Sequence, residues 1–173
     1  ARNMQAAGAP VVCVYPGAVW GPENPTLGDQ ITTIFAMVKG GYYLSVYGGM
    51  PIIDARDLAE GVARAMVPGN GPQRFILSGH YQSHDEMRRL LSRLRGRKLL
   101  PAPVPVWLLR FVGRVGDFLT SLGFNTGAVR YESMVIATSG FRGDDSHSLK
   151  TLGFALRPIE ETVEAQLRWL HSH

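Results

Sequence analysis

Residues 9–22 read APVVCVYPGAVWGP, and this stretch decides the fold class. Residues 10–15 form a short, uninterrupted run of β-branched and other apolar side chains. Such a run predicts a strand that is buried on both faces, as in parallel sheets. Two prolines and two glycines in residues 16–22 predict a tight loop directly after the strand. The apolar position of Cys13 within the run predicts a buried and inert thiol.

Strands and helices alternate in the first half of the chain, and the second half is mostly helical. The pattern predicts the end of a helix at 1–9, further strands at 42–47, 51–53 and 74–78, an extended segment at 98–104, and helices at 31–38, 57–67, 83–96, 106–122, 128–138, 148–152 and 158–170. The expected fold class is therefore α/β.

Two of the predicted helices begin with recognisable capping residues. Asp57 is expected to cap its helix, with Glu60 three residues later in the spacing of a capping box. The stretch from Ser83 to Glu86 has the same spacing and predicts a second capping box.

The composition excludes several classes of site. The single cysteine excludes an internal disulfide and a zinc site built from cysteines. The five histidines form no metal-binding pattern, so no metal is predicted. No stretch offers about 20 nearly uncharged residues for a membrane-spanning helix, and we expect a cytoplasmic protein.

Two surfaces have alternative interpretations. Six basic residues lie between positions 88 and 98, and they favour a solvated helix face over a nucleic-acid or anionic-membrane site, because no aromatic residues are interleaved with them. The apolar helix 106–122 is expected to pack over a substrate pocket or the core, with a position at a membrane surface as the alternative.

Four segments in order resemble a known family. Residues 9–22 resemble the "RPGxVYGP" region of the extended short-chain dehydrogenases/reductases, the NAD-dependent epimerase/dehydratase family. Residues 53–59, 144–154 and 157–170 resemble its "VDVRDLA", "DxSKAxxxLGF" and "RPxEETL…W" segments. Details such as the "DARDLA" form lean toward the dihydroflavonol-reductase-like or 3β-hydroxysteroid-dehydrogenase-like branches, or toward nearby sugar epimerases.

The sequence also departs from the family pattern. The cofactor fingerprint TGxxGxxG is absent, and no lysine follows a tyrosine in the YxxxK spacing of the catalytic pair. That tyrosine exchanges a proton with the substrate oxygen, so hydride transfer lacks its acid/base partner without it. No catalytic residue is therefore predicted in this chain.

The resemblance implies that the chain is the C-terminal half of such an enzyme. Its expected fold is the C-terminal part of a Rossmann-type parallel sheet plus a mostly helical substrate-binding lobe. We expect one truncated unit, in which residues 1–80 hold the last Rossmann strands interleaved with substrate-lobe segments. Residues 81–173 would then be mainly the substrate-binding lobe and the C-terminal helix. The alternative is a non-catalytic substrate-binding module that lacks the cofactor half.

The resemblance also implies partners. The parent enzyme is expected to use NAD or NADP, which this chain alone would bind weakly. Its substrate would be a nucleotide sugar, a sterol or a similar hydroxy or keto compound, and nucleic acid is not an expected partner. The missing N-terminal half would cover a sheet edge, so the isolated chain is expected to self-associate through that edge.

Specific residues carry these expectations. The resemblance places Pro16, Gly17, Ala18 and Val19 against the nicotinamide end of the cofactor, and a tight turn capping the strand is the structural alternative. Trp20, Arg56 and Arg142 are the candidate substrate-binding residues; the arginines suit an anionic group because the guanidinium offers a bidentate fork. Packing under the loop is the alternative for Trp20, and a solvated surface position is the alternative for each arginine. Asp144 is expected to order the turn that follows it.

Overall fold

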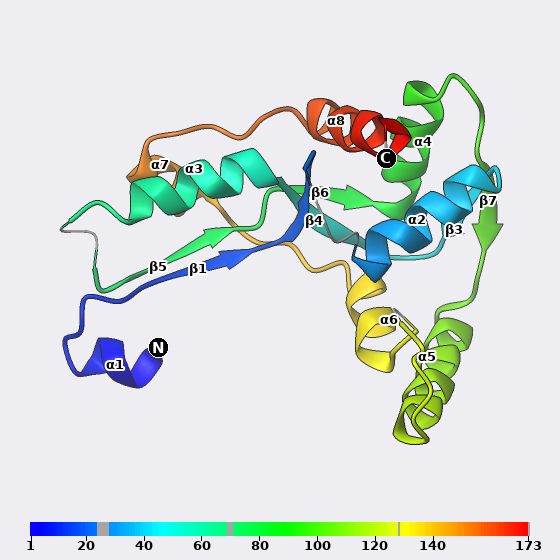
Figure 1. Cartoon of the computed structure of the whole chain (residues 1–173), viewed down its shortest axis with the longest axis horizontal. Coiled ribbons are helices and arrows are strands. Elements are labelled where there is room, and N and C mark those ends of the chain that lie inside the picture. Colours follow the sequence, from blue (N-terminus) through cyan, green and yellow to red (C-terminus); the bar gives the residue numbers. More distant parts are fainter. Residues whose placement is uncertain (24–27, 69–70, 128, 173) are drawn as a thin grey trace. The chain divides into compact units, whose positions relative to one another are not determined.

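A computed structural model describes residues 1–23, 28–68, 71–127 and 129–172 of the chain. The fold is mixed α/β with parallel strand pairs, as the sequence predicts (Figure 1). The chain divides into two compact units. Unit 1 comprises residues 1–23, 51–81 and 142–173, and unit 2 comprises residues 24–50 and 82–141. Which segments serve a cofactor and which serve a substrate stays a prediction.

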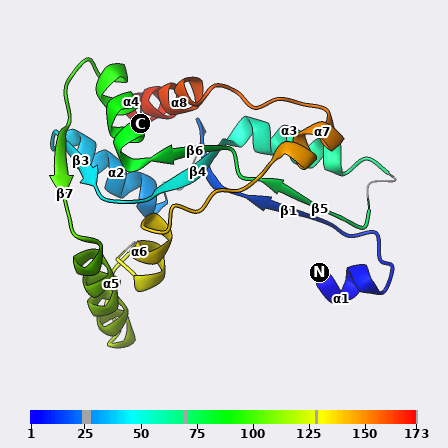
Figure 2. The same ribbon diagram turned by 180° about the vertical axis from the view of Figure 1, so that it is seen from behind.

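Parallel strand pairs form the sheets of unit 1. Strand β1 (Val12–Pro16) pairs with β5 (Gln73–Leu77), and the two lie side by side in Figures 1 and 2. Strand β2 (Ala18–Trp20) pairs with β4 (Gly49–Asp54). The order β2-β4-β6, with β6 at His80–Ser83, completes a three-stranded sheet.

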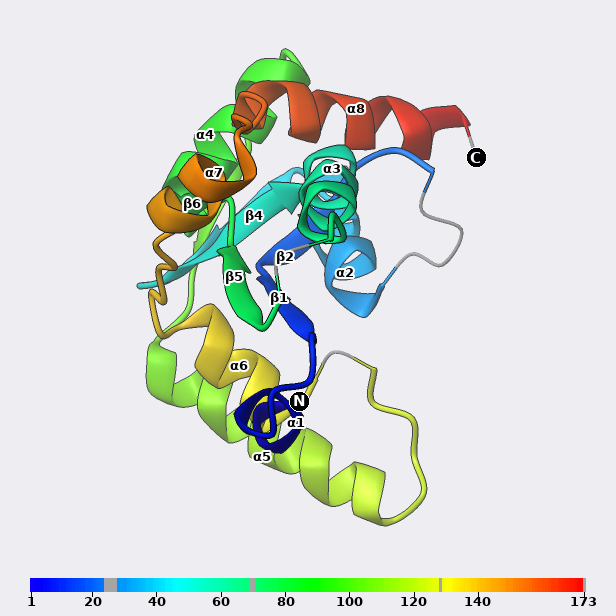
Figure 3. The same cartoon turned by 90° about the vertical axis from the view of Figure 1, so that its left-hand side faces the viewer.

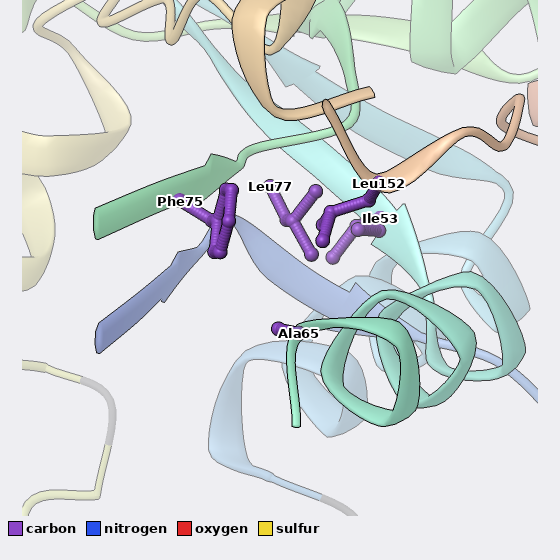
Figure 4. Close-up of a cluster of buried hydrophobic side chains, with 5 residues drawn as sticks. All are labelled: Ile53, Ala65, Phe75, Leu77 and Leu152. Atoms are coloured by element: carbon purple, nitrogen blue, oxygen red, sulfur yellow. The ribbon is translucent and has the colours of Figure 1, made fainter. Parts of the chain in front are cut away.

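The described helices of unit 1 are α1 (Arg2–Ala6), α3 (Ala55–Ala65), α7 (Ser146–Leu152) and α8 (Ile159–Ser172). Helices α3 and α7 contribute to its core, whereas α1 has no buried residue. Figure 4 shows five buried side chains that meet between the strands, α3 and α7: Ile53, Ala65, Phe75, Leu77 and Leu152. Helix α7 ends at Leu152, where the sequence predicts its end, and Gly153 follows in the left-handed conformation.

Unit 2 combines one parallel strand pair with four helices among its described residues. Strand β3 (Tyr42–Ser45) pairs with β7 (Leu100–Pro103). The helices are α2 (Asp29–Lys39), α4 (His84–Leu94), α5 (Val106–Ser121) and α6 (Tyr131–Ala137). The predicted capping box of α4 is confirmed, because Ser83 and Glu86 bond to each other's backbone amides.

The prediction that β1 is buried on both faces is wrong. Tyr15 is 47% exposed, and Ile76, directly opposite it on β5, is 42% exposed. Val12 and Val14 pack against the core cluster on the other face, so this two-stranded sheet is covered on one side within the described chain. Cys13 is half-buried for the same reason, and the prediction of a fully buried thiol is also wrong.

Two other local predictions are wrong. Helix α3 begins after Asp54, whose side chain accepts a hydrogen bond from the Arg56 amide, so Asp54 and not Asp57 is the N-cap. The predicted loop at 16–22 contains β2, because residues 18–20 pair with β4. The sequence also gave no indication of β6.

Helix α5 lies beside α6 (Figure 3), and two of its glycines approach α6 and the residue Val129 before it. Much of the apolar surface of α5 is exposed. A Cβ atom on Gly113 would lie 2.7 Å from Tyr131 Cα, and one on Gly116 would lie 2.9 Å from the Val129 carbonyl carbon. Trp107, Phe111 and Phe118 are 69%, 58% and 63% exposed. The expectation that this helix packs over the core or a pocket is therefore wrong for most of its apolar side chains.

The basic segment of α4 is partly neutralised. Arg88 and Arg89 both pair with Asp85, at 2.6 and 2.5 Å. Arg95 donates to the Val38 carbonyl. Within the described chain, none of the helices has the length and apolar character needed to cross a membrane.

Candidate functional site

The predicted cofactor loop lies where β1 ends and β2 begins in unit 1. The Gly17 amide donates to the Leu77 carbonyl at 3.1 Å, which continues the β1–β5 ladder by one residue. A Cβ atom on Gly17 would lie 2.8 Å from the Pro51 carbonyl oxygen and would overlap the Ser78 carbonyl. Contact with the protein's own backbone is therefore enough to require glycine here, and the cofactor role of Gly17 stays a prediction.

The neighbours of Gly17 present an accessible apolar edge. Pro16 is exposed, Ala18 is half-buried, and Val19 is 38% exposed. These side chains stand at the carboxyl end of β1, the end at which open α/β sheets bind ligands. Their shape and polarity fit the flat face of a nicotinamide ring, and they offer nothing that would hold a phosphate group.

Trp20 lies in the interior of unit 1. Its side chain is 1% exposed, and its indole N–H has no hydrogen-bond partner among the described residues. The next amide, that of Gly21, donates to Gln166 Oε1 at 2.9 Å. Packing under the loop explains this position, and substrate contact by Trp20 stays a prediction.

A buried carboxylate fixes the loop after β5, and the sequence did not indicate it. Asp145 accepts hydrogen bonds from the Ser78 amide at 2.9 Å, the Ser78 hydroxyl at 2.5 Å and the Gly79 amide at 2.7 Å. Asp144 beside it bonds to the Ser146 amide at 3.0 Å, which confirms that it orders the following turn. Hydrogen bonds from Ser146 lower the pKa of Asp144.

Arg56 is held by carboxylates on both sides. Its Nε and Nη2 donate to the two Asp54 carboxylate oxygens at 2.9 and 2.8 Å, and Glu161 lies 3.4 Å from Nη2. Burial by itself would raise the pKa of Asp54, but hydrogen bonds from the Arg56 side chain and amide outweigh it and lower that pKa. An anionic ligand would have to compete with these carboxylates for Arg56.

A second buried ion pair lies beside Arg56 and was also missed. Asp57 accepts from the Arg157 amide at 2.8 Å and pairs with the Arg157 guanidinium. Glu161 lies 3.5 Å from Arg157 Nε, and the Arg157 carbonyl bonds to His80 Nε2 at 2.7 Å. This network connects α3 to the segment before α8, which explains why Asp57 is buried instead of capping a helix.

Arg142 is the more available of the two candidate arginines. Its guanidinium carbon lies 4.2 Å from the centre of the Tyr81 ring, and its side chain is exposed. No described carboxylate forms an ion pair with it. Stacking on the ring orients the guanidinium while its N–H groups stay free to bind an anion.

Unit 2 holds a pocket that the sequence did not predict. It has a volume of about 560 Å³ and is lined by residues of α2, β3, the start of β4, His84, and residues between 125 and 137. This volume lies within the range of pockets that hold small molecules. Among the described residues, no group of His, Cys, Asp and Glu side chains could hold a metal ion.

Comparison with known proteins identifies relatives that share this fold. No family model matches the chain. The sterol demethylase protein B of Methylococcus capsulatus is 27% identical over 166 residues, which are 94% of this chain and 50% of that protein. The crystal structure of gox2253 is 25% identical with a TM-score of 0.73 over 99% of this chain and 52% of its own. A nucleoside-diphosphate-sugar epimerase from Pseudomonas aeruginosa, PA4631, is also 25% identical, with a TM-score of 0.67 over 99% of this chain and 51% of its own.

The chain is similar to members of the NAD-dependent epimerase/dehydratase family, as the sequence motifs predict. It spans about half the length of the relatives it matches, and the match is to the C-terminal part of their Rossmann-type structures. The UDP-glucuronic acid 4-epimerase of Bacillus cereus, solved with UDP-glucuronic acid and NAD, shares the fold at 12% identity and a TM-score of 0.63. The predicted resemblance and the predicted fold class are thereby confirmed.

Proposed function

We propose that this chain is the substrate-binding, C-terminal portion of an NAD(P)-dependent oxidoreductase or epimerase that acts on a hydroxyl or keto carbon. One observation carries the proposal: the chain aligns over nearly its whole length with only half of each epimerase-like relative. The absence of TGxxGxxG and YxxxK from its 173 residues supports the same interpretation.

In this proposal the residues of unit 1 position the reacting groups. Pro16, Ala18 and Val19 contact the nicotinamide ring at the carboxyl end of β1. NAD or NADP, when bound, supplies the hydride chemistry. Asp145 fixes the neighbouring loop, and Arg142 is placed to bind an anionic group where the substrate carries one, as a nucleotide sugar does. Proton transfer at the substrate oxygen requires a segment that carries the YxxxK pair.

The substrate class follows from the relatives. Nucleotide sugars and sterols are the two classes that the names of the relatives suggest, and both offer a hydroxyl or keto carbon. NAD is the cofactor found with structural neighbours, and the choice between NAD and NADP stays open. A cytoplasmic location is part of this proposal.

Two observations test the proposal. One is an NADH fluorescence titration of the 173-residue chain, and the other is the coding sequence upstream of Ala1. We expect an in-frame TGxxGxxG and YxxxK upstream, and weak NADH binding by the 173-residue chain that Val19→Asp weakens further. Met66→Asp is the matched control, because Met66 is 77% exposed at the end of α3. A start codon close to the Ala1 codon, without those motifs before it, would support the alternative of a non-catalytic binding module.

A further inference from the structure

The pocket of unit 2 has the chemistry of a site for a hydrocarbon. Its walls are formed largely by Ile34, Leu44, Ile136 and the three methionines Met37, Met50 and Met134. Methionine side chains are flexible and polarisable, so they adapt to the irregular outline of an apolar ligand. Burial of apolar ligand surface against such walls is the main favourable contribution to its binding.

One of the residues that line this pocket carries a phenol hydroxyl. Tyr43 lines the pocket, and its side chain is 1% exposed. Burial raises the pKa of Tyr43 above its ordinary value, so the phenol is neutral and keeps its proton. A neutral phenol donates one hydrogen bond, and a ligand oxygen within its reach would accept that bond.

The neighbouring imidazole is neutral as well. His84 lies beside Tyr43, with 6.2 Å between ring centres, and its Nε2 bonds to the Ala137 carbonyl at 2.9 Å. Burial lowers the pKa of His84 more than that hydrogen bond raises it. A carbonyl only accepts hydrogen bonds, so Nε2 carries the proton and donates. The neutral ring brings no charge to the pocket.

Charge is confined to the rim of the pocket. Arg130 is the one cationic side chain among the described lining residues, it is exposed, and no described carboxylate lines the walls. A diphosphate needs several cations or N–H donors around it. Besides Tyr43 and His84, the other polar side chains in the lining are Thr33, Asn125 and Ser133, which is a poor set for a nucleoside diphosphate.

We propose that this pocket binds the hydrocarbon body of a hydroxy or keto compound, with the Tyr43 hydroxyl bonded to an oxygen of that compound. The inference rests on the proposed function, because it names the substrate class of the same substrate-binding portion. It favours an apolar substrate over a nucleotide sugar.

Methyl-labelled methionine NMR on the 173-residue chain tests the proposal without any turnover. The chain has six methionines, and three of them line the pocket. Met4 and Met66 are exposed in unit 1 and serve as internal references. Androstenedione, a steroid diketone, should shift the signals of Met37, Met50 and Met134 saturably, and UDP should leave them unchanged.

Substitutions at and beside the pocket test whether the methionine methyl shifts report binding in it. Tyr43→Phe should weaken steroid binding about fivefold, the effect of one lost hydrogen bond. Ser133→Trp should abolish the shifts by filling the mouth of the pocket, and Glu132→Trp, its exposed neighbour on α6 outside the lining, should not.

Two results would overturn the proposal. If UDP and not the steroid shifts the three pocket signals, the pocket is a nucleotide site. If neither probe shifts them, or if Met4 and Met66 shift equally, the pocket has no such ligand. The proposed function fails separately, by the absence of NADH binding and of the upstream motifs.

Discussion

The carboxylate of Asp145 holds Ser78 through both its amide and its hydroxyl, at 2.9 and 2.5 Å, although 67 residues separate them in the sequence. Asp145 is 8% exposed, so these bonds are shielded from water. They fix the turn that follows β5, next to the end of β1. The Ser78 carbonyl in turn lies against Gly17 of the candidate cofactor loop.

Removal of this carboxylate should destabilise unit 1. Asp145→Ala leaves the Ser78 hydroxyl and two amides without their acceptor, and we expect a loss of about 2–4 kcal/mol in the free energy of unfolding. Urea denaturation measures it. Asp144→Ala is the matched control, because Asp144 is exposed and bonds only within its own turn. Equal effects of the two substitutions would contradict the role of Asp145.

Gly17 should be required for folding as well as for any cofactor contact. A methyl group at this position would meet the Pro51 carbonyl oxygen at 2.8 Å, and such overpacking costs about 1–3 kcal/mol. Thermal unfolding of Gly17→Ala measures the cost. Gly28→Ala, where no atom lies within 4 Å of the new methyl group, should cost less than about 1 kcal/mol. A fully stable Gly17→Ala variant would mean that the glycine serves only a ligand.

Loss of the ion pair between Asp54 and Arg56 should lower the free energy of unfolding at acid pH. The pKa of Asp54 is lowered in the folded chain, so the unfolded chain binds a proton more readily. The contribution of this ion pair to the free energy of unfolding is fully present above the pKa of an unfolded aspartate, about 3.9. It is lost as the pH falls through the lower pKa of Asp54 in the folded chain. Asp54→Asn should flatten the fall in unfolding free energy below about pH 4. Urea titrations at a series of pH values measure this slope, and an unchanged slope would exclude Asp54 as its source.

The exposed face of the β1–β5 sheet should drive self-association. Tyr15 and Ile76 stand opposite each other and are 47% and 42% exposed. Sedimentation velocity should show concentration-dependent oligomers that the double substitution Tyr15→Lys and Ile76→Lys suppresses. Met66→Lys, at another exposed apolar position of unit 1, should leave them intact. A wild-type monomer at high concentration would contradict this prediction.

The sequence predicted the features that depend on neighbouring residues. The capping box from Ser83 to Glu86 and the stop at Gly153 are local, and both are confirmed. The apolar run of β1 also identified a parallel strand correctly. Its exposed face was not predictable, because residue type does not show whether another segment covers it.

Features decided by distant partners could not be predicted. The choice of Asp54 over Asp57 as the helix cap depends on Arg157, which binds Asp57 from 100 residues away. Strand β2 lies between Gly17 and Gly21, in a stretch whose prolines and glycines predict a loop. The pocket of unit 2 combines β3, His84 and α6, and no spacing in the sequence connects these segments.

Turnover tests the central claim most directly. NADH formation from NAD and a panel of sterol and sugar alcohols should be measured for the 173-residue chain. The same measurement should be made for the longer polypeptide that includes this chain and the residues encoded upstream of Ala1 in the same reading frame. We predict turnover only by the longer polypeptide, and its loss when the lysine of the upstream YxxxK is replaced. Comparable turnover by the 173-residue chain alone would contradict the account.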